Sequence, residues 1–402
     1  MKCIYGVLLS VLFVIAFTEL MFAQWVQTSC PVSGTVNALT VSGTNIFAGT
    51  SAGGIYVSID DGDSWNAVNN GLTEQLVRAV AVSSNNIFAG TKSGVFKSTN
   101  NGNSWSAVDS GLTTKYVFAL TVSDTNVFAG TYGGGVFIST NEGITWAATA
   151  LANANINCLA STDSDLFAGR GLQGVYVSTD EGKSWNSENK GLSNTTVNAM
   201  VFANSNLYAG TYGGVFSYTS SIASWKGINS GLADLNVNAL TTNNGNIFAG
   251  TYTGVYLLLN NDTTWINVED GFSREITSLT VAGKYIFAGT YVSGLWRRPI
   301  SEMITGVKYE GGNTPSKFAL MQNYPNPFNP ATRINYSIPK TSFVTIKVYD
   351  VLGKEITTLV NNEKLAGRYY INFNSSKLTS GVYFYRMQAG SFIETKKLIV
   401  LK

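Results

Sequence analysis

Short stretches in which apolar and polar residues alternate recur along most of the chain, separated by turns rich in glycine, asparagine and serine. A period of two residues is typical of β-strands with one buried face. The pentapeptide Ile-Phe-Ala-Gly-Thr and its variants mark a longer repeat. Its aromatic position recurs at intervals of 41, 40, 39, 41, 40 and 39 residues, at Phe47, Phe88, Phe128, Phe167, Tyr208, Phe248 and Phe287. A period near 40 residues built from short strands predicts a β-propeller, and seven copies predict seven blades.

Each period divides into four predicted strands. The first is an apolar run such as Val36–Val41, the second contains the Phe-Ala-Gly-Thr step, and the third follows a glycine-rich turn, as in Gly94–Ser98. The fourth begins at a tryptophan, in turn Trp65, Trp105, Trp146, Trp185, Trp225 and Trp265. No stretch of the repeat region has helical periodicity, so the sequence predicts an all-β ring.

The tryptophans predict how the ring closes. The seventh repeat has no tryptophan near residue 305, whereas Trp25 lies 40 residues before Trp65. We therefore expect the strand that begins at Trp25 to complete the seventh blade, which leaves no open edge between the first and last blades.

The turn before the tryptophan has the pattern Ser-x-Asp/Asn-x-Gly-x-Ser/Thr-Trp in four repeats. An Asp or Asn side chain caps backbone N–H groups in a tight turn, and glycine supplies a positive φ. The positions are Asp60, Gly62 and Trp65; Asn100, Gly102 and Trp105; Asn141, Gly143 and Trp146; and Asp180, Gly182 and Trp185.

This pattern resembles the Asp-box, or BNR repeat, of sialidases, sortilin-type receptors and photosystem II assembly propellers. The copies at 218–225 and 258–265 have lost the Asp and the Gly. A catalytic or metal-binding role for the acids is the alternative to turn capping. We favour turn capping, because four copies of one turn cannot all be one active site.

The amino-acid composition excludes several kinds of catalytic and binding site. The 402 residues include 41 glycines, 21 phenylalanines and 20 tyrosines but no histidine, and only 12% are charged. Without histidine, Ser-His-Asp and Cys-His catalytic sites are excluded, and we expect no metal and no cofactor. Residues 25–300 carry a net charge of −5 and residues 301–402 one of +7, without a basic run dense enough for nucleic-acid binding.

The amino terminus has the pattern of an export signal. Lys2 precedes an apolar run, Val7–Phe17, that is too short to span a membrane, and cleavage is expected after Ala23. A retained signal anchor is the alternative. Cys30 and Cys158 remain in the mature chain at different repeat positions, so we expect small buried apolar side chains rather than a disulfide.

One end of the ring collects the turns between second and third strands and the links between blades. It carries residues at the end of the Ala-Gly-Thr or Ala-Gly-Arg step, which we predict to bind a ligand: Lys92, Tyr132, Arg170, Tyr212, Tyr252 and Tyr291. Tyrosines around a central channel can stack on sugars or hold a peptide. The alternative is a repeat turn in which tyrosine only covers backbone.

The same end also carries weaker candidates for catalytic residues. Glycoside hydrolysis needs two carboxylates about 5–10 Å apart. The acids in the links are Glu74, Asp234 and Glu275, and the last two enter neighbouring blades, so they are the best pair. The ring arginines are Arg78, Arg170, Arg274, Arg297 and Arg298, and Arg297-Arg298-Pro299-Ile300 does not match the Arg-Ile-Pro motif of sialidases.

From Pro315 a second all-β unit follows a glycine-containing linker, residues 301–314. Its predicted strands are Ile334–Ile338, Val344–Tyr349, Tyr369–Phe373, Val382–Met387 and Ile393–Leu401, which predict a small immunoglobulin-like sandwich.

This unit closely resembles the type A sorting domain of the type IX secretion system of Bacteroidetes and their relatives. The motif residues are Tyr324, Pro325, Asn326, Pro327, Phe328, Asn329 and Pro330, then Asp350, Gly353, Gly381, Lys396 and Lys397. The resemblance implies Sec export, recognition by the outer-membrane translocon, removal of the domain, and release or surface attachment. An ordinary immunoglobulin-like module is the alternative.

The sequence therefore predicts four segments: a signal peptide in residues 1–23, a propeller in 24–300, a linker in 301–314 and a sorting domain in 315–402. We expect a secreted or cell-surface monomer that binds a glycan or a protein without enzymatic activity. A secreted glycoside hydrolase or lyase is the alternative.

Overall fold

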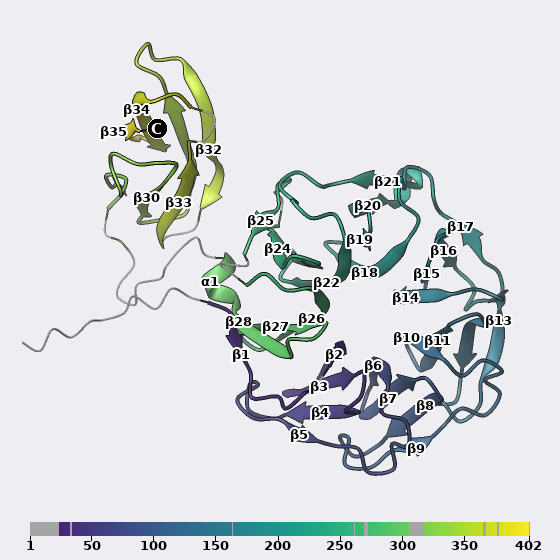
Figure 1. Cartoon of the computed structure of the whole chain (residues 1–402). Helices are drawn as coiled ribbons and strands as arrows, with labels where there is room; N and C mark the ends of the chain where they lie inside the picture. The colour runs from purple at the N-terminus through teal and green to yellow at the C-terminus, as the bar shows by residue number, and fades with distance from the viewer. Residues whose placement is uncertain are drawn as a thin grey trace, which may run out of the picture.

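The computed structural model describes residues 24–401 except 33, 163, 261, 269–271, 305–314, 316, 365–366 and 376–377. The expected signal peptide and most of the expected linker lie outside the described residues. Seven antiparallel sheets of four strands are arranged around a central axis in the described part of residues 26–299 (Figure 1). We number these sheets in chain order, beginning with β2–β5.

The strands of the first six sheets run outward from the axis in chain order, and the seventh sheet has β1 as its outermost strand. The innermost strands contact one another in a closed cycle and are β2 (Val36–Ser42), β6 (Val77–Ser83), β10 (Val117–Ser123), β14 (Ile156–Ser161), β18 (Val197–Ala203), β22 (Val237–Asn243) and β26 (Ile276–Ala282). The second strands are β3 (Asn45–Thr50), β7 (Asn86–Thr91), β11 (Asn126–Thr131), β15 (Leu166–Arg170), β19 (Asn206–Thr211), β23 (Asn246–Thr251) and β27 (Tyr285–Thr290).

The third strands are β4 (Ile55–Ser58), β8 (Gly94–Ser98), β12 (Gly135–Ser139), β16 (Gly174–Ser178), β20 (Gly214–Thr219), β24 (Val255–Leu258) and β28 (Leu295–Pro299). The outermost strands are β5 (Asn66–Ala67), β9 (Ser106–Ala107), β13 (Ala147–Ala152), β17 (Asn186–Ser187), β21 (Ser224–Gly227), β25 (Ile266–Asn267) and β1 (Val26–Gln27). A 3-10 turn, η1 (Ser220–Ile222), and a short helix, α1 (Ile300–Ile304), are the helical segments of the described ring.

The strand β1 completes the seventh sheet, as the position of Trp25 predicts. Val26 pairs with Arg297 and Gln27 with Trp296, so β1 is the outer neighbour of β28. Trp25 is buried, its Nε1 donates to the carbonyl of Val268 at 3.0 Å, and its ring stacks on Phe272 at 5.0 Å. The amino-terminal residues of the ring therefore belong to the core of its last sheet.

The Phe-Ala-Gly-Thr step holds neighbouring sheets together. Its glycine lies so close to the first residue of the next inner strand that a Cβ on Gly90 would be 2.7 Å from the Val117 side chain. The same approach occurs at all seven junctions, including Gly289 against Val36. The threonine is buried, and in Thr91 its Oγ1 donates to the carbonyl of Gly94 across the turn at 2.9 Å. The motif is repeated because each sheet needs this close contact.

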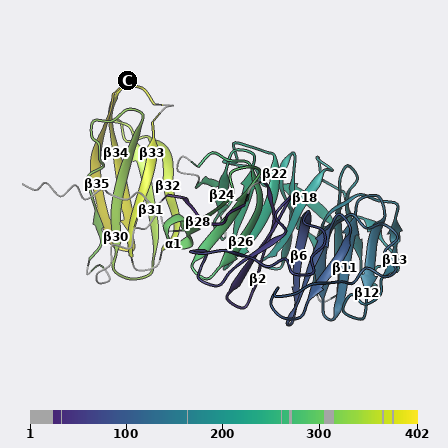
Figure 2. The ribbon, with the colours of Figure 1, turned by 60° about the horizontal axis from the view of Figure 1, so that its bottom comes forward.

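The C-terminal strands form a unit of their own (Figure 2). One sheet has the order β29 (Ala319–Leu320), β30 (Ala331–Ile338), β33 (Gly367–Asn374), and the other has the order β32 (Glu355–Lys364), β31 (Ser342–Tyr349), β34 (Gly381–Ala389), β35 (Phe392–Val400). Both sheets contribute to one core, which contains Ile334, Tyr336, Val344, Ile346 and Tyr385. Strands β29 and β32 were not predicted from the sequence. The alternation in β32 is obscured by threonines and asparagines, which are also common in turns.

Candidate functional site

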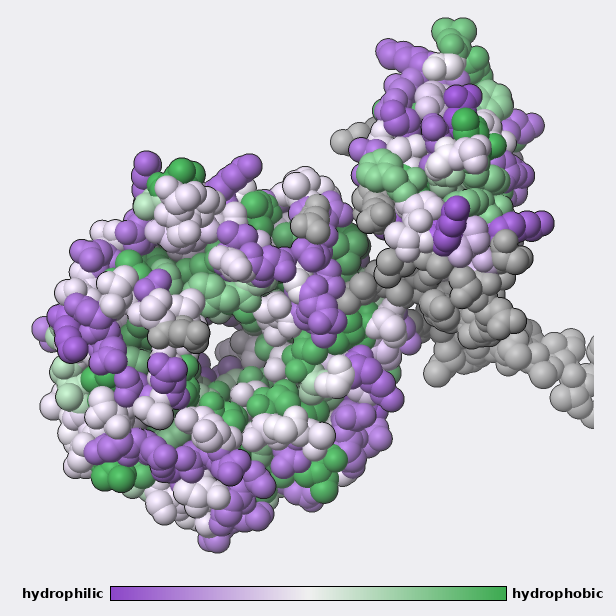
Figure 3. Space-filling view, turned by 180° about the vertical axis from the view of Figure 1, so that it is seen from behind, coloured by the Kyte–Doolittle hydropathy of each residue, from purple (hydrophilic) through white to green (hydrophobic). Residues whose placement is uncertain are grey.

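The two ends of the ring have different surfaces, because antiparallel strands place successive turns at opposite ends. We call the end with the turns between second and third strands the tyrosine end, and the end with the turns before the tryptophans the tryptophan-turn end. The space-filling view shows an opening through the middle of the ring (Figure 3). A ligand at the tyrosine end therefore faces both the turns and the mouth of a channel.

At the tryptophan-turn end, the acids and amides of the repeated turn are used within the turn. Asp60 Oδ1 accepts from the N–H of Ser64 at 2.9 Å, and Asp60 Oδ2 accepts from the Ser64 hydroxyl at 2.5 Å. Hydrogen bonds from Ser64 and Ser58 lower the pKa of Asp60 to about 2, and the same arrangement lowers the pKa of Asp180 to about 2. Asn100 and Asn141 accept the same backbone N–H in their copies, at 2.9 Å. These contacts support a turn-capping role.

The glycine of the turn fits against the preceding sheet. A Cβ on Gly62 would lie 2.5 Å from the ring of Phe287, and one on Gly102 would lie 3.2 Å from Phe47. In the fifth sheet, where the pattern is lost, η1 and Ala223 with a φ of 45° replace the turn. In the first three copies the turn glycine therefore packs on the aromatic residue of the Phe-Ala-Gly-Thr step in the preceding sheet, whereas Gly182 of the fourth copy packs on Thr149.

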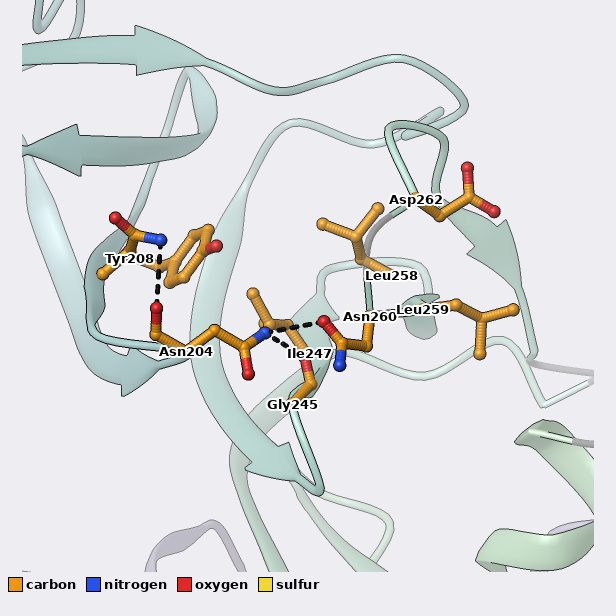
Figure 4. A pocket seen from close by; sticks show the side chains of 9 residues that line it. Asn204, Tyr208, Gly245, Ile247, Leu258, Leu259, Asn260 and Asp262 are labelled. Atoms are coloured by element: carbon orange, nitrogen blue, oxygen red, sulfur yellow. Dashed lines mark hydrogen bonds between the residues drawn. The ribbon is translucent and has the colours of Figure 1, made fainter. Parts of the chain in front are cut away.

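A cavity of about 160 Å³ opens at this end, between the fifth and sixth sheets (Figure 4). Asn204, Asn206, Tyr208, Asn260 and Asp262 contribute its polar lining. Asn204 Nδ2 donates to the carbonyl of Gly245 at 3.1 Å and to Asn260 Oδ1 at 2.9 Å, and burial raises the pKa of Tyr208. This cavity was not predicted from the sequence, although the altered turn at 258–265 contributes Leu258, Leu259, Asn260 and Asp262 to its lining.

At the tyrosine end, the predicted ligand-binding residues form separate groups rather than one cluster. Tyr132, Tyr212, Tyr252 and Tyr291 are exposed, by 57%, 45%, 43% and 54%. The rings of Tyr212 and Tyr252 are neighbours, with their centroids 6.4 Å apart. Arg170 lies over the ring of Tyr176 at 4.9 Å, and Lys92 is exposed.

The acids predicted as a catalytic pair lie in the same region as Tyr252. Hydrogen bonding to Tyr212 is the main cause of a raised Tyr252 pKa, and the charges of Glu275 and Asp234 add to it. Burial raises the pKa of Glu275. Burial opposes ionisation of Asp234, but hydrogen bonds from Asn236, Thr251 and Thr253 outweigh it together and lower the Asp234 pKa.

Both Asp234 oxygens accept hydrogen bonds from the local backbone. Oδ1 accepts from the N–H of Asn236 at 3.0 Å and Oδ2 from the N–H of Thr253 at 2.9 Å. Glu74, at the equivalent position before the second sheet, accepts from the N–H of Leu76 at 2.9 Å and from the hydroxyl of Ser93 at 3.0 Å. Both acids therefore connect a link between sheets to the neighbouring turn.

The arginines considered for a sialidase-type cluster lie at separate positions in the ring. Arg297 binds the carbonyl of Asp61 and the carboxylate of Asp63, and so connects the seventh sheet to the first. Arg298 is buried and donates to the carbonyl of Val268 at 2.6 Å. Arg274 lies over Trp296 at 6.0 Å and Arg78 over Phe118 at 5.1 Å.

The second residue of each inner strand forms a repeated contact that was not predicted from the sequence. At five of the seven junctions its side chain donates to the carbonyl of the first inner-strand residue in the next sheet. These bonds are Asn37 to Val77 (2.8 Å), Asn157 to Val197 (3.2 Å), Asn198 to Val237 (3.1 Å), Asn238 to Ile276 (3.1 Å) and Thr277 to Val36 (2.7 Å). We call this series the asparagine ladder. The recurring Val-Asn-Ala triplets of the sequence were its signal.

Arg78 and Phe118 occupy the ladder position in the second and third sheets. Arg78 Nη2 donates to the hydroxyl of Tyr116 at 3.4 Å. Phe118 packs on Tyr116 at 4.6 Å and, nearly parallel, on Tyr132 at 5.6 Å. The two consecutive exceptions thus place a guanidinium and three aromatic rings together at the tyrosine end.

Two remaining features bear on the chemistry. Cys30 and Cys158 are free thiols, and burial raises the pKa of each to about 12, so neither is an activated nucleophile. Among the described side chains, no group of three or more His, Cys, Asp or Glu residues is placed to hold a metal. The described part of the chain also has no helix with the length and apolarity of a membrane crossing.

Comparison with known proteins identifies the C-terminal unit. Residues 322–401 match the family of secretion system C-terminal sorting domains. A sorting domain of the type IX system indicates export to the cell surface or secretion, and interaction with that secretion machinery. No curated protein matches the chain in sequence.

Solved structures match the fold. PorZ, an essential surface component of the type-IX secretion system of Porphyromonas gingivalis, aligns with a TM-score of 0.57 and 16% identity over 92% of this chain, which spans 60% of PorZ. The GH74 enzyme of Niastella koreensis aligns with a TM-score of 0.56 and 14% identity, over 94% of this chain and 75% of that one. YCF48 bound to the D1 peptide aligns with a TM-score of 0.58 and 15% identity, over 70% and 98%. All three neighbours are β-propellers, so the ring has the fold of propeller proteins with different functions.

Proposed function

We propose that the chain is a secreted or cell-surface binding module without enzymatic activity, in which a seven-bladed Asp-box propeller binds a glycan or protein ligand. In this proposal residues 1–23 are a cleaved export signal, residues 24–300 the propeller and residues 301–314 a linker. Residues 315–402 form an immunoglobulin-like sorting domain. The Sec machinery and then the type IX translocon export the chain, and the sorting domain is removed.

The observation that carries the binding proposal is the exposed tyrosine pair. Tyr212 and Tyr252 sit on neighbouring sheets with rings in contact and about half of each side chain exposed. Exposed aromatic rings offer a large apolar surface with a polar hydroxyl at its edge, which suits sugars and peptides alike.

A binding assay with matched variants tests this proposal. The full secreted protein is labelled and applied to a glycan array and to cell-surface protein fractions. Tyr212→Ala with Tyr252→Ala is expected to lower affinity by about tenfold or more at an unchanged melting temperature. Ile144→Ala, which truncates a 63% exposed apolar side chain at the tryptophan-turn end of the ring, is the control and is expected to bind normally. Unchanged binding by the double variant would contradict the role of this pair.

A fusion experiment tests the export route. Residues 310–402 attached to a periplasmic reporter are expected to deliver it outside the cell only in strains that have the type IX translocon. The same fusion in a strain without the translocon is the control, and reporter is expected to stay in the periplasm. Secretion in both strains would exclude a sorting function for this segment.

A glycoside hydrolase is the second candidate, favoured by one observation. The pKa of Asp234 is lowered and that of Glu275 is raised, which is the opposite tuning that an acid and a base of a glycosidase need. Hydrolysis on a panel of glycans that is lost in both Asp234→Asn and Glu275→Gln would establish this function. Activity that survives both substitutions would remove these residues as its catalytic pair.

A further inference from the structure

The interrupted part of the asparagine ladder is the strongest unexplained feature at the tyrosine end. Five ladder positions hold Asn or Thr side chains that bond to the next sheet. The guanidinium carbon of Arg78 instead lies over the Phe118 ring, 5.1 Å from its centroid, and the Phe118 ring stacks on Tyr132 at 5.6 Å with an interplanar angle of 27°. A larger cation on an aromatic surface has replaced a small structural amide.

The guanidinium of Arg78 has unused hydrogen-bonding capacity. Its Nε is buried without a partner in the described structure, and its bond to the Tyr116 hydroxyl is long, at 3.4 Å. None of the ion pairs between described residues involves Arg78, and the nearby Glu74 is held by Leu76 and Ser93. Arginine presents five N–H donors in a planar fork that matches a carboxylate.

The charges of the tyrosine end are distributed to match an acidic ligand. Arg78 and Lys92 belong to the second sheet and Arg170 to the fourth, whereas Asp234 and Glu275 precede the sixth and seventh sheets. Two acids lie on the side of Arg78, but Glu74 already accepts hydrogen bonds from Leu76 and Ser93, and Asp109 is paired with Lys115 at 2.9 Å. Arg170 Nε is also buried without a partner among the described residues. An anionic ligand is therefore attracted to the side of the channel mouth that holds Arg78.

We infer that Arg78, Tyr116, Phe118 and Tyr132 form a binding site for the uronate units of an acidic polysaccharide. The sugar carboxylate binds the Arg78 fork, and the apolar face of the pyranose ring lies on the exposed ring of Tyr132. A uronate carries its carboxylate and its apolar ring face on one rigid unit, which matches a guanidinium held beside the 57% exposed ring of Tyr132. This inference rests on the proposed binding function and assigns its ligand class.

Titration calorimetry of the full secreted protein with oligogalacturonate tests the inference. We expect binding that weakens with added salt, and no binding of the carboxyl-reduced, neutral oligosaccharide. Arg78→Asn, which restores the residue type of the ladder, is expected to fold normally and to lose affinity by about tenfold to a hundredfold. Arg78→Lys keeps the charge but not the fork and is expected to lie between the two.

The matched control is Lys226→Asn, which removes one positive charge from the exposed outer strand β21 and is expected to leave affinity unchanged. Equal affinity of the wild type and Arg78→Asn would overturn the site. Binding of an acidic peptide that depends on Arg78, with none of the oligosaccharide, would overturn the ligand class. In either case, ligand binding that depends on Tyr212 and Tyr252 would leave the proposed binding function standing.

Discussion

Thr277 of the seventh sheet donates its hydroxyl to the carbonyl of Val36 in the first, 2.7 Å away and 241 residues earlier in the chain. The hydroxyl of the adjacent Ser278 donates to the same oxygen at 2.8 Å. Two hydroxyls on one carbonyl make this junction of the asparagine ladder doubly connected. These bonds join the last sheet to the first near the axis, in addition to the contacts of Arg297 with Asp61 and Asp63.

This shared acceptor predicts a non-additive effect on stability. Thr277→Val or Ser278→Ala alone leaves one donor, so each is expected to lower the free energy of unfolding by less than about 1 kcal/mol. The double variant leaves the Val36 carbonyl without either hydroxyl and is expected to lose about 1–3 kcal/mol. Denaturant titration measures these values. Thr280→Val on the same strand is the control, and simple additivity would contradict the prediction.

Removal of Trp25 is expected to open the ring at its rim. Trp25→Ala deletes a buried ring that stacks on Phe272 and donates to Val268, so a loss of about 3–5 kcal/mol is expected. Val26→Ala, next to it but 56% exposed, is the control and is expected to change stability little. Deletion of residues 25–32 is expected to lower the melting temperature far more. A small loss on deletion would show that β1 is dispensable.

Alanine substitutions at Gly111 and Gly133 distinguish the cost of a steric clash from the cost of a strained backbone. Both have a φ of 90°, but a Cβ on Gly111 would lie 2.2 Å from the carbonyl oxygen of Trp146, whereas Gly133 has open space. Both alanine variants incur the cost of positive φ, about 1 kcal/mol. Gly111→Ala is expected to lose at least about 2 kcal/mol more in denaturant titration. Equal losses of unfolding free energy in the two variants would mean that the link containing Gly111 moves away from Trp146 at little cost.

The mixed use of Asp and Asn in the repeated turn predicts a pH effect with a definite sign. The pKa of Asp60 and of Asp180 falls from 3.8 to about 2 in the folded state, so their stabilising contribution is present above pH 4 and is lost as the pH falls towards 2. Asp60→Asn with Asp180→Asn, which copies Asn100 and Asn141, removes this titration.

Melting temperatures measured between pH 6 and pH 2 test this effect. The difference between the wild type and the double variant is expected to shrink, or to change sign in favour of the variant, towards pH 2. Two curves that stay parallel would show that these carboxylates titrate alike in the folded and unfolded chains.

The sequence predicted the parts of the fold that repeat along the chain. The period of about 40 residues indicated four strands per unit, and the position of Trp25 indicated its place beside the last sheet, because strand pairing leaves a pattern in the chain itself. The asparagine ladder was missed, although Asn37, Asn198 and Asn238 stand in visible triplets. Each of these side chains bonds to the next sheet, and that contact exists only once the ring is formed.

The candidate site was predicted only in part, for the same reason. The tyrosine positions at one end follow from strand direction. Arg78 and Phe118 interrupt a pattern, and their meaning depends on the neighbours at that position, which the structure supplies. Asp234 looked like a free acid in the sequence, because nothing in a single link shows that Thr253 donates to it across a turn.

The pairing of β1 with β28 has a consequence for the order of events during secretion. Thr28 and its partner Leu295 are 267 residues apart along the chain. In the proposed export route, β1 therefore leaves the cytoplasm early and has no strand to pair with until almost the whole repeat region has followed. Contacts of such large separation form late and slowly. A chain that crosses a pore from its amino terminus therefore cannot close the ring during transit. The ring closes only when β28 of the last repeat has crossed and can pair with β1.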